Sequence, residues 1–330
     1  TPPQKNLLRL GLYLALFPKL VMGPIVPYHE LEPALAQRTI DAQDVSDGCF
    51  RFTIGLAKKA LLADALAGLV TGIWGDLASL TVLSAWLGLI GYALQLYFDF
   101  SGYSDMAIGL GRMLGFRFPE NFRYPYLCSS ISDFWRRWHI SLGSWFKEYL
   151  YFPLGGSRAG TLRTLRNLLL VWLATGLWHG ASWNYVLWGL YFGVLICLEK
   201  LLAPRFRAHP RKGLLAGLYR PVCLLLAVLG WVLFRAEDLP AAGRYFACLF
   251  GGAAGASAQA RLYLHDFWPV LLLGAVGATP LCAKLAGRLG AKLQPGVRAA
   301  VQAVLVLALL ACSTVWLLNG SFQSFVYFQF

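Results

Sequence analysis

Long apolar stretches recur along the chain, separated by short polar and basic segments. A helix needs about 20 apolar residues to cross a hydrocarbon layer of about 30 Å, and six stretches approach that length. The pattern predicts membrane-crossing helices at residues 78–98, 164–179, 182–202, 218–235, 266–283 and 298–318. The expected fold is therefore all-α, a multi-pass bundle of transmembrane helices.

Two further apolar segments are interrupted. Residues 7–28 are broken by three prolines and by Lys19, so kinked or re-entrant backbone is expected there, packed against protein. Residues 45–73 look helical and mostly apolar, but charged side chains such as Lys58 and Asp64 leave their depth in the membrane open. No internal repeat or separable soluble domain is visible, so residues 1–330 are expected to form a single transmembrane domain.

Composition excludes an ordinary soluble protein. Of the 330 residues, 58% are hydrophobic and only 14% are charged, whereas a soluble domain carries about a quarter charged residues. The seven cysteines have no paired spacing, so neither a disulfide framework nor a metal site is expected. The chain opens with Thr1 and not with methionine, which favours the later part of a longer protein.

The charge is strongly basic, with 29 Lys and Arg against 16 Asp and Glu. These basic residues lie in short segments between apolar stretches, as membrane orientation signals do, so nucleic-acid binding is not expected. The basic loops at residues 204–212 and 284–298 should both face the cytoplasm. Two predicted spans separate these loops, which makes the assignment self-consistent and leaves the C-terminal end outside.

His179 is expected deep in the membrane. If Arg166 marks the cytoplasmic boundary, His179 lies about thirteen residues further along a helix, or ~20 Å at 1.5 Å per residue. The sequence Gly180-Ala-Ser then suggests that the helix ends there. An ionisable group at that depth is costly unless it faces a cavity or a partner.

A histidine in that position could serve as a general base, because its ordinary pKa of about 6.5 lies near ambient pH. It would take the proton from a hydroxyl acceptor while that oxygen attacks a thioester. The alternative is a neutral histidine that hydrogen-bonds Ser182 or Asn184 and merely joins two helices.

A second histidine occurs in an amphipathic segment. Residues 133–150 place their aromatic and aliphatic side chains on one face of a helix and most charged side chains on the other. His139 falls within the apolar face, near Trp135 and Phe146, and is expected to point away from the charged face. The helix could also be a membrane-surface anchor, which would not explain a histidine on its apolar side.

Residues 95–189 resemble the membrane-bound O-acyltransferase family, in particular the bacterial branch that includes alginate O-acetylases and peptidoglycan O-acetyltransferases. The matching strings are QLYFDFSGYSDMAIGLGRMLGF, PENFRYPY, SDFWRRWHISLGSWFKEYLYFPLGG and LWHGASWNYVLWG. Residues 17–31 and the C-terminal FVYFQF fit the same branch.

The resemblance implies His179 as the catalytic residue and His139 as a second functional histidine. It also implies helices, some amphipathic or re-entrant, around a central funnel, in the bacterial cytoplasmic (inner) membrane.

No bound cofactor is expected; acetyl-CoA or another acyl thioester would be the donor. The acceptor would be a cell-surface polysaccharide, with an extracytoplasmic accessory acetyltransferase as partner. Family members are usually longer at the N-terminus.

Four other residues are weaker candidates. Tyr327, in the C-terminal aromatic segment, could relay an acyl group on its phenol oxygen, although interfacial anchoring is the commoner use of such aromatics. Asp99 and Asp105 could line a polar pathway or orient a histidine, but helix capping is the simpler interpretation. Asn184 could line the site beside His179.

Two other functions stay open. A D-alanyl exporter for teichoic acids would use a carrier protein as donor, and the terminal FVYFQF argues mildly against it, because that system tends to supply this motif on a separate protein. A transporter or lipid flippase could use the buried histidines as a proton relay. Transporters of this kind often have paired broken helices in two related halves, and no such symmetry is found. A structural scaffold is the weakest alternative.

Overall fold

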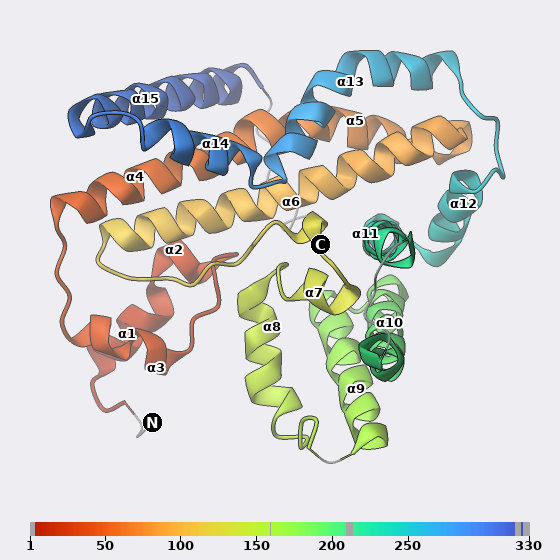
Figure 1. Cartoon of the computed structure of the whole chain (residues 1–330), viewed down its shortest axis with the longest axis horizontal. Helices are drawn as coiled ribbons and strands as arrows, with labels where there is room; N and C mark the ends of the chain where they lie inside the picture. The colour runs from red at the N-terminus through yellow and green to blue at the C-terminus, as the bar shows by residue number, and fades with distance from the viewer. Residues whose placement is uncertain (1–3, 159, 209–213, 321–324, 326–330) are drawn as a thin grey trace. The chain divides into compact units, whose positions relative to one another are not determined.

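The computed structural model describes residues 4–158, 160–208, 214–320 and 325. Every regular element in this part of the chain is a helix (Figure 1), as predicted. The elements are α1 Leu7–Ala15, α2 Phe17–Leu20, α3 Tyr28–Ala36, α4 Ala42–Ala57, η1 Lys58–Ala63, α5 Asp64–Trp74, η2 Leu77–Ser79, α6 Val82–Met113, η3 Pro125–Leu127, α7 Ile131–Trp135, α8 Ile140–Phe146, η4 Lys147–Tyr151, α9 Thr161–His179, α10 Trp183–Ala208, α11 Leu214–Arg235, α12 Leu239–Leu249, α13 Ala258–Gly277, α14 Leu281–Gly290 and α15 Pro295–Asn319.

Four helices among the described residues are long and apolar enough to cross a membrane. They are Val82–Met113, Trp183–Leu202, Gly217–Arg235 and Pro295–Asn319. The pair α13 and α14 passes the same test together, but with a bend of 67° between the two helices. The protein is thus a multi-pass membrane protein, with four such helices or up to five if the bent pair counts as one span.

Two predicted spans need correction. The span expected at 266–283 crosses the bend between α13 and α14, where Pro280 ends one helix direction and begins the next. The span expected at 164–179 does form a helix, α9, but Arg163, Arg166 and Asn167 in its first turns make it too polar to qualify by composition. The predicted break in residues 7–28 is confirmed, since only the short α1 and α2 and the start of α3 form there.

The chain folds into two compact units, and α5 and α6 contribute residues to both. The first unit comprises Thr1–Ala65, Gln95–Arg123 and Pro280–Gln329. The second comprises Leu66–Leu94 and Tyr124–Thr279.

In the first unit, α4 crosses α6 at two pairs of glycines. A Cβ atom on Gly55 would lie 2.5 Å from the carbonyl oxygen of Gly102, and one on Gly109 would lie 2.6 Å from that of Gly48. The absence of side chains at these points lets the two backbones touch, as small residues do between membrane helices.

Ion pairs join the helices of the first unit. Lys58 binds Asp105 at 2.6 Å, and the buried Lys59 binds Asp99 at 2.8 Å and Asp64 at 2.6 Å. Asp99 and Asp105 therefore lie inside α6 as partners of lysines. The expectation that they cap a helix end is wrong, because α6 continues to Met113.

The second unit is held together by aromatic side chains and a close helix pair. The helices α9 and α10 run side by side (Figure 1). A Cβ atom on Gly176 would lie 2.4 Å from the carbonyl oxygen of Tyr185, and one on Gly189 would lie 2.3 Å from that of Trp172. This contact brings the end of α9, where His179 lies, against the first turns of α10.

Candidate functional site

His179 is the last residue of α9. The helix ends where the Gly180-Ala-Ser sequence predicted, since Gly180 has a φ of +157° and a Cβ there would lie 2.8 Å from the ring of Tyr185. The imidazole packs edge-on against Trp188 of α10 and Phe234 of α11, with ring centroids 5.0 and 5.1 Å away. Two neighbouring helices therefore pack aromatic groups against this ring.

His139 lies at a break between two helices, which corrects the predicted continuous helix over residues 133–150. The helix α7 ends at Trp135, and α8 begins directly after His139. His139 has a left-handed backbone conformation, with φ +45° and ψ +54°, which costs about 1–2 kcal/mol for a residue with a Cβ atom. Periodicity could not reveal the break, because apolar residues continue at helical spacing through it.

The His139 side chain lies in the protein interior with 5% relative exposure. Its ring centroid lies 6.3 Å from that of Trp178, the residue before His179. Burial, together with the nearby His179, lowers the pKa of His139 below its ordinary value. The imidazole is therefore neutral at pH 7 and can accept a proton or donate its single N–H.

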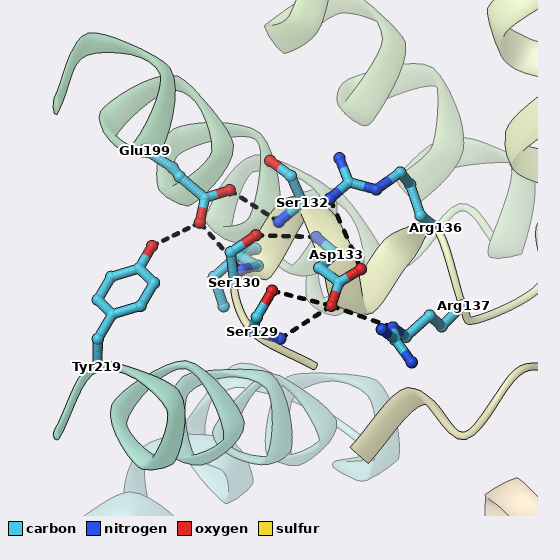
Figure 2. Close-up of polar contacts among 9 residues, drawn as sticks. Ser129, Ser130, Ser132, Asp133, Arg136, Arg137, Glu199 and Tyr219 are labelled. Carbon is cyan, nitrogen blue, oxygen red and sulfur yellow. Dashed lines mark hydrogen bonds and ion pairs between the residues drawn. The ribbon is translucent and has the colours of Figure 1, made fainter. Parts of the chain in front are cut away.

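Local hydrogen bonds hold the segment that leads to His139. The Ser130 side chain accepts from the backbone N–H of Asp133 at 3.0 Å, as an N-cap residue does. The Asp133 carboxylate accepts from the backbone N–H of Ser129 at 2.9 Å and pairs with Arg137 at 3.0 Å (Figure 2). Burial alone would raise the pKa of Asp133, but these bonds outweigh it and the pKa is lowered, so the carboxylate stays ionised and ties α7 to the turn before His139.

Both histidines line one cavity of about 430 Å³ in the second unit. Its volume falls within the range of small-molecule sites, about 300–1,000 Å³. The apolar lining comes from Trp135, Trp138, Ile140, Leu142, Gly143, Phe146, Leu168, Val171, Trp172 and Ile196. The polar lining comes from Ser132, Arg136, His139, Ser144, Lys147, Tyr151, Thr175 and His179.

The other predicted site residues are not among the residues that line this cavity. Asn184 is buried, and its amide donates to the carbonyl oxygen of Ala236 at 2.6 Å, which ties the start of α10 to the residue after α11. Asp99 and Asp105 belong to the ion pairs of the first unit. Tyr327 lies outside the described residues. Among those residues, no group of three or more His, Cys, Asp or Glu side chains could hold a metal ion.

Sequence reasoning missed two features of the site. Glu199 is a carboxylate within the apolar helix α10. An ionisable side chain in a membrane segment is costly, and this argument, which selected His179, applies equally to Glu199. Ser130 and Asp133 have the Ser-x-x-Asp spacing of a capping box, which would have predicted a new helix start at residue 131.

The sequence model of the family described as MBOAT, membrane-bound O-acyltransferase family, matches residues 5–229. The chain belongs to this family. A protein from Pseudomonas fluorescens named "Probable alginate O-acetylase AlgI" is 46% identical over 254 residues, which is 76% of this chain and 50% of that protein. The peptidoglycan O-acetyltransferase of Helicobacter pylori is 40% identical over 242 residues, 72% of this chain and 45% of that protein.

A more distant family relative is the teichoic acid D-alanyltransferase of Bacillus subtilis, 30% identical over 207 residues, 58% of this chain and 51% of that protein. The chain spans about half the length of the curated relatives it matches. The family match includes both histidines and all the cavity-lining residues, which lie between residues 132 and 196.

Proposed function

We propose that this chain is a membrane O-acyltransferase that moves an acetyl group from a cytoplasmic thioester for O-acetylation of a cell-surface polysaccharide. The acceptor would be an alginate-like exopolysaccharide or peptidoglycan, and the location would be the bacterial cytoplasmic membrane. The observation that carries the proposal is that His139 and His179, from separate segments, line the same cavity. Family membership supplies the reaction class.

His179 acts as the general base in this reaction. The acceptor hydroxyl oxygen attacks the thioester carbonyl carbon while the imidazole takes the hydroxyl proton. The C–S bond then breaks, and the leaving thiolate takes the proton from the imidazolium. The products are the O-acetyl ester and the free thiol. The aromatic rings of Trp188 and Phe234 pack edge-on against the imidazole and hold its orientation.

His139 has a complementary role. Its neutral imidazole has one N–H to donate, and the thioester oxygen gains negative charge as the hydroxyl attacks. A donor fixed beside that oxygen stabilises the transition state more than the ground state. The constrained backbone at His139 favours such a fixed orientation.

The donor is acetyl-CoA or another acyl thioester that carries phosphate. Arg136 and Lys147 line the cavity together with both histidines, and Lys and Arg are the usual partners of phosphate oxygens. The apolar tryptophans of the lining suit the uncharged arm that joins the phosphate to the thioester. Arg136 and Lys147 are expected to contribute to donor binding, whereas the histidines contribute to the chemical step.

An extracytoplasmic accessory acetyltransferase would complete delivery to the sugar, and Tyr327 could carry the acetyl group on its phenol oxygen in between. Such a relay requires that Tyr327→Phe abolish acetylation of the polymer. If the polymer is acetylated normally in that variant, the relay does not exist and the thioester transfers its acetyl group to another acceptor hydroxyl.

The proposal is tested in membranes supplied with radiolabelled acetyl-CoA. His179→Ala should abolish label transfer to protein, partner or polymer, because it removes the base. The matched control is His265→Ala, since His265 is exposed on α13, where its ring pairs with the neighbouring Asp266. Normal transfer by His179→Ala would contradict the proposed function.

The same assay separates the alternatives. A D-alanyl exporter, favoured by the 30% identical teichoic acid relative, would transfer label from a D-alanyl carrier protein and not from acetyl-CoA. A transporter would leave acetyl-CoA unhydrolysed and would form no acetyl ester.

A further inference from the structure

Glu199 joins three helices of the second unit at one point. Its side chain extends from α10, and its carboxylate accepts the backbone N–H groups of Ile131 at 3.2 Å and Ser132 at 2.8 Å. These are the first two residues of α7. The hydroxyl of Tyr219, on α11, donates to the same carboxylate at 2.5 Å. Figure 2 shows the carboxylate between the Tyr219 ring and the start of α7.

The helix α7 connects the residues that Glu199 binds to His139. It is only five residues long, so its first turn and its last residue move together. The Asp133–Arg137 ion pair, at 3.0 Å, connects α7 to the turn before His139. Trp138, directly before His139, stacks on Phe134 with ring centroids 5.7 Å apart. Fixing the start of α7 therefore fixes the backbone on which the His139 ring depends.

The same helix that carries Glu199 also contacts the other histidine. Trp188 and Tyr185 of α10 pack against the His179 ring, with centroids 5.0 and 6.4 Å away. One rigid helix thus contacts His179 near its start and holds the His139 segment further along. The distance between the two imidazoles therefore depends on where these two contacts lie on α10.

We propose that Glu199, oriented by Tyr219, is a positioning residue that sets the His139 ring relative to His179 through the first turn of α7. It does not itself touch the substrate, since it is not among the cavity-lining residues. The consequence for catalysis rests on the proposed acyl-transfer function; the consequence for the His139 ring does not.

The chemistry of the contact requires a carboxylate. One oxygen accepts from Ile131 and Tyr219 and the other from Ser132, so each of these three partners is a donor. A glutamine has nearly the same size but offers only one acceptor oxygen, and its NH₂ group would face a donor. Negative charge beside the start of a helix is also favourable. Glu199→Gln therefore keeps at most one side of the anchor, with little change in packing.

The activity test compares purified Glu199→Gln with wild type, with His179→Ala and with the matched control Glu237→Gln, in which Glu237 is exposed in the same unit. Displacing a catalytic group by about 1 Å can cost 10²-fold in rate, so we expect kcat to fall about 10–100-fold. The KM for acetyl-CoA and the thermal midpoint in detergent should stay unchanged. Tyr219→Phe should give a smaller fall, and the double variant no more than Glu199→Gln alone.

The second readout does not require activity. The chain has five histidines, so selective ¹⁵N labelling gives a spectrum in which His139 can be assigned by its loss in His139→Asn. Glu199→Gln should shift the His139 ring signals, and Glu237→Gln should not. An unshifted His139 signal, an unchanged kcat, or a kcat that falls only together with the thermal midpoint would overturn the inference.

These arms distinguish the two proposals. The proposed function fails if the wild type transfers no acetyl group, or if His179→Ala transfers it as fast as the wild type does. In either case the His139 spectrum still decides whether Glu199 positions the His139 ring.

Discussion

The backbone at His139 adopts a conformation that residues with a Cβ atom rarely take. Among the described residues that are not glycine, only Tyr124 and His139 have a positive φ. Strained residues of this kind persist where the surroundings hold them and often occur at functional sites. Here the surroundings are the Asp133–Arg137 pair and the stacked Phe134 and Trp138.

The chemistry and the conformation of His139 can be separated by mutation. Asn tolerates the left-handed region well, but its shorter side chain does not carry an N–H to the position of the imidazole N–H. His139→Asn should therefore keep its thermal midpoint within a few degrees while acetyl transfer falls about 10²–10³-fold, the usual effect of losing one donor to a developing oxyanion. The measurement is single-turnover acetyl transfer beside thermal unfolding in detergent. Activity close to wild type would exclude a chemical role for His139.

At the scale of elements, the α9–α10 pair fixes where His179 lies. Gly176 allows the backbone of Tyr185 to approach, and Tyr185 and Trp188 of α10 then contact the His179 ring. The pair depends on glycines because any side chain at this crossing would meet backbone atoms that cannot move aside.

A methyl group at this crossing should therefore impair both stability and activity. Gly176→Ala places a Cβ 2.4 Å from a backbone oxygen, and overpacking of this kind costs roughly 1–3 kcal/mol. We expect a lower thermal midpoint and slower acetyl transfer. The control is Gly243→Ala in α12, where a Cβ meets nothing within 4 Å and where alanine should stabilise the helix by up to about 1 kcal/mol. Equal effects of the two substitutions would contradict the close helix crossing.

Some of these elements could be predicted from the sequence, and others could not. Apolar length predicted α10, α11 and α15 closely, because a membrane span needs a long apolar run whatever its neighbours are. It did not predict the break at His139, since the local pattern is still helical and only tertiary contacts stabilise the left-handed residue. It placed a single span across the α13–α14 bend because apolar residues flank Pro280 on both sides.

At the scale of the molecule, the cavity brings together residues from α7 to α10. The motifs that carried the family resemblance contain both histidines, so these residues could be chosen from the sequence. Their common cavity could not be predicted, because it depends on how the helices pack, and the local sequence pattern does not show that packing. Glu199 could have been chosen from the sequence as a charge within an apolar helix, but its contacts could not be predicted, because its partners lie in other helices.

Filling this cavity should exclude the donor. Val171 of α9 lines the cavity, whereas the adjacent Leu170 is 41% exposed and does not. Val171→Trp should raise the KM for acetyl-CoA at least 10-fold, or abolish transfer, because the indole occupies space that the donor needs. Leu170→Trp is the matched control on the same helix and should behave like wild type. Unchanged kinetics in Val171→Trp would mean that the donor binds elsewhere.

The central claim is that an acyl donor reacts between His139 and His179 inside this cavity. The most direct measurement is a structure of the membrane-embedded protein with acetonyl-CoA, in which a methylene separates the sulfur from the carbonyl so that no transfer can occur. We predict the donor arm in the cavity, with the carbonyl group within reach of both rings and open to a hydroxyl positioned about 3–3.5 Å away. An empty cavity, with the analogue bound elsewhere or both rings enclosed by packed side chains, would contradict the account.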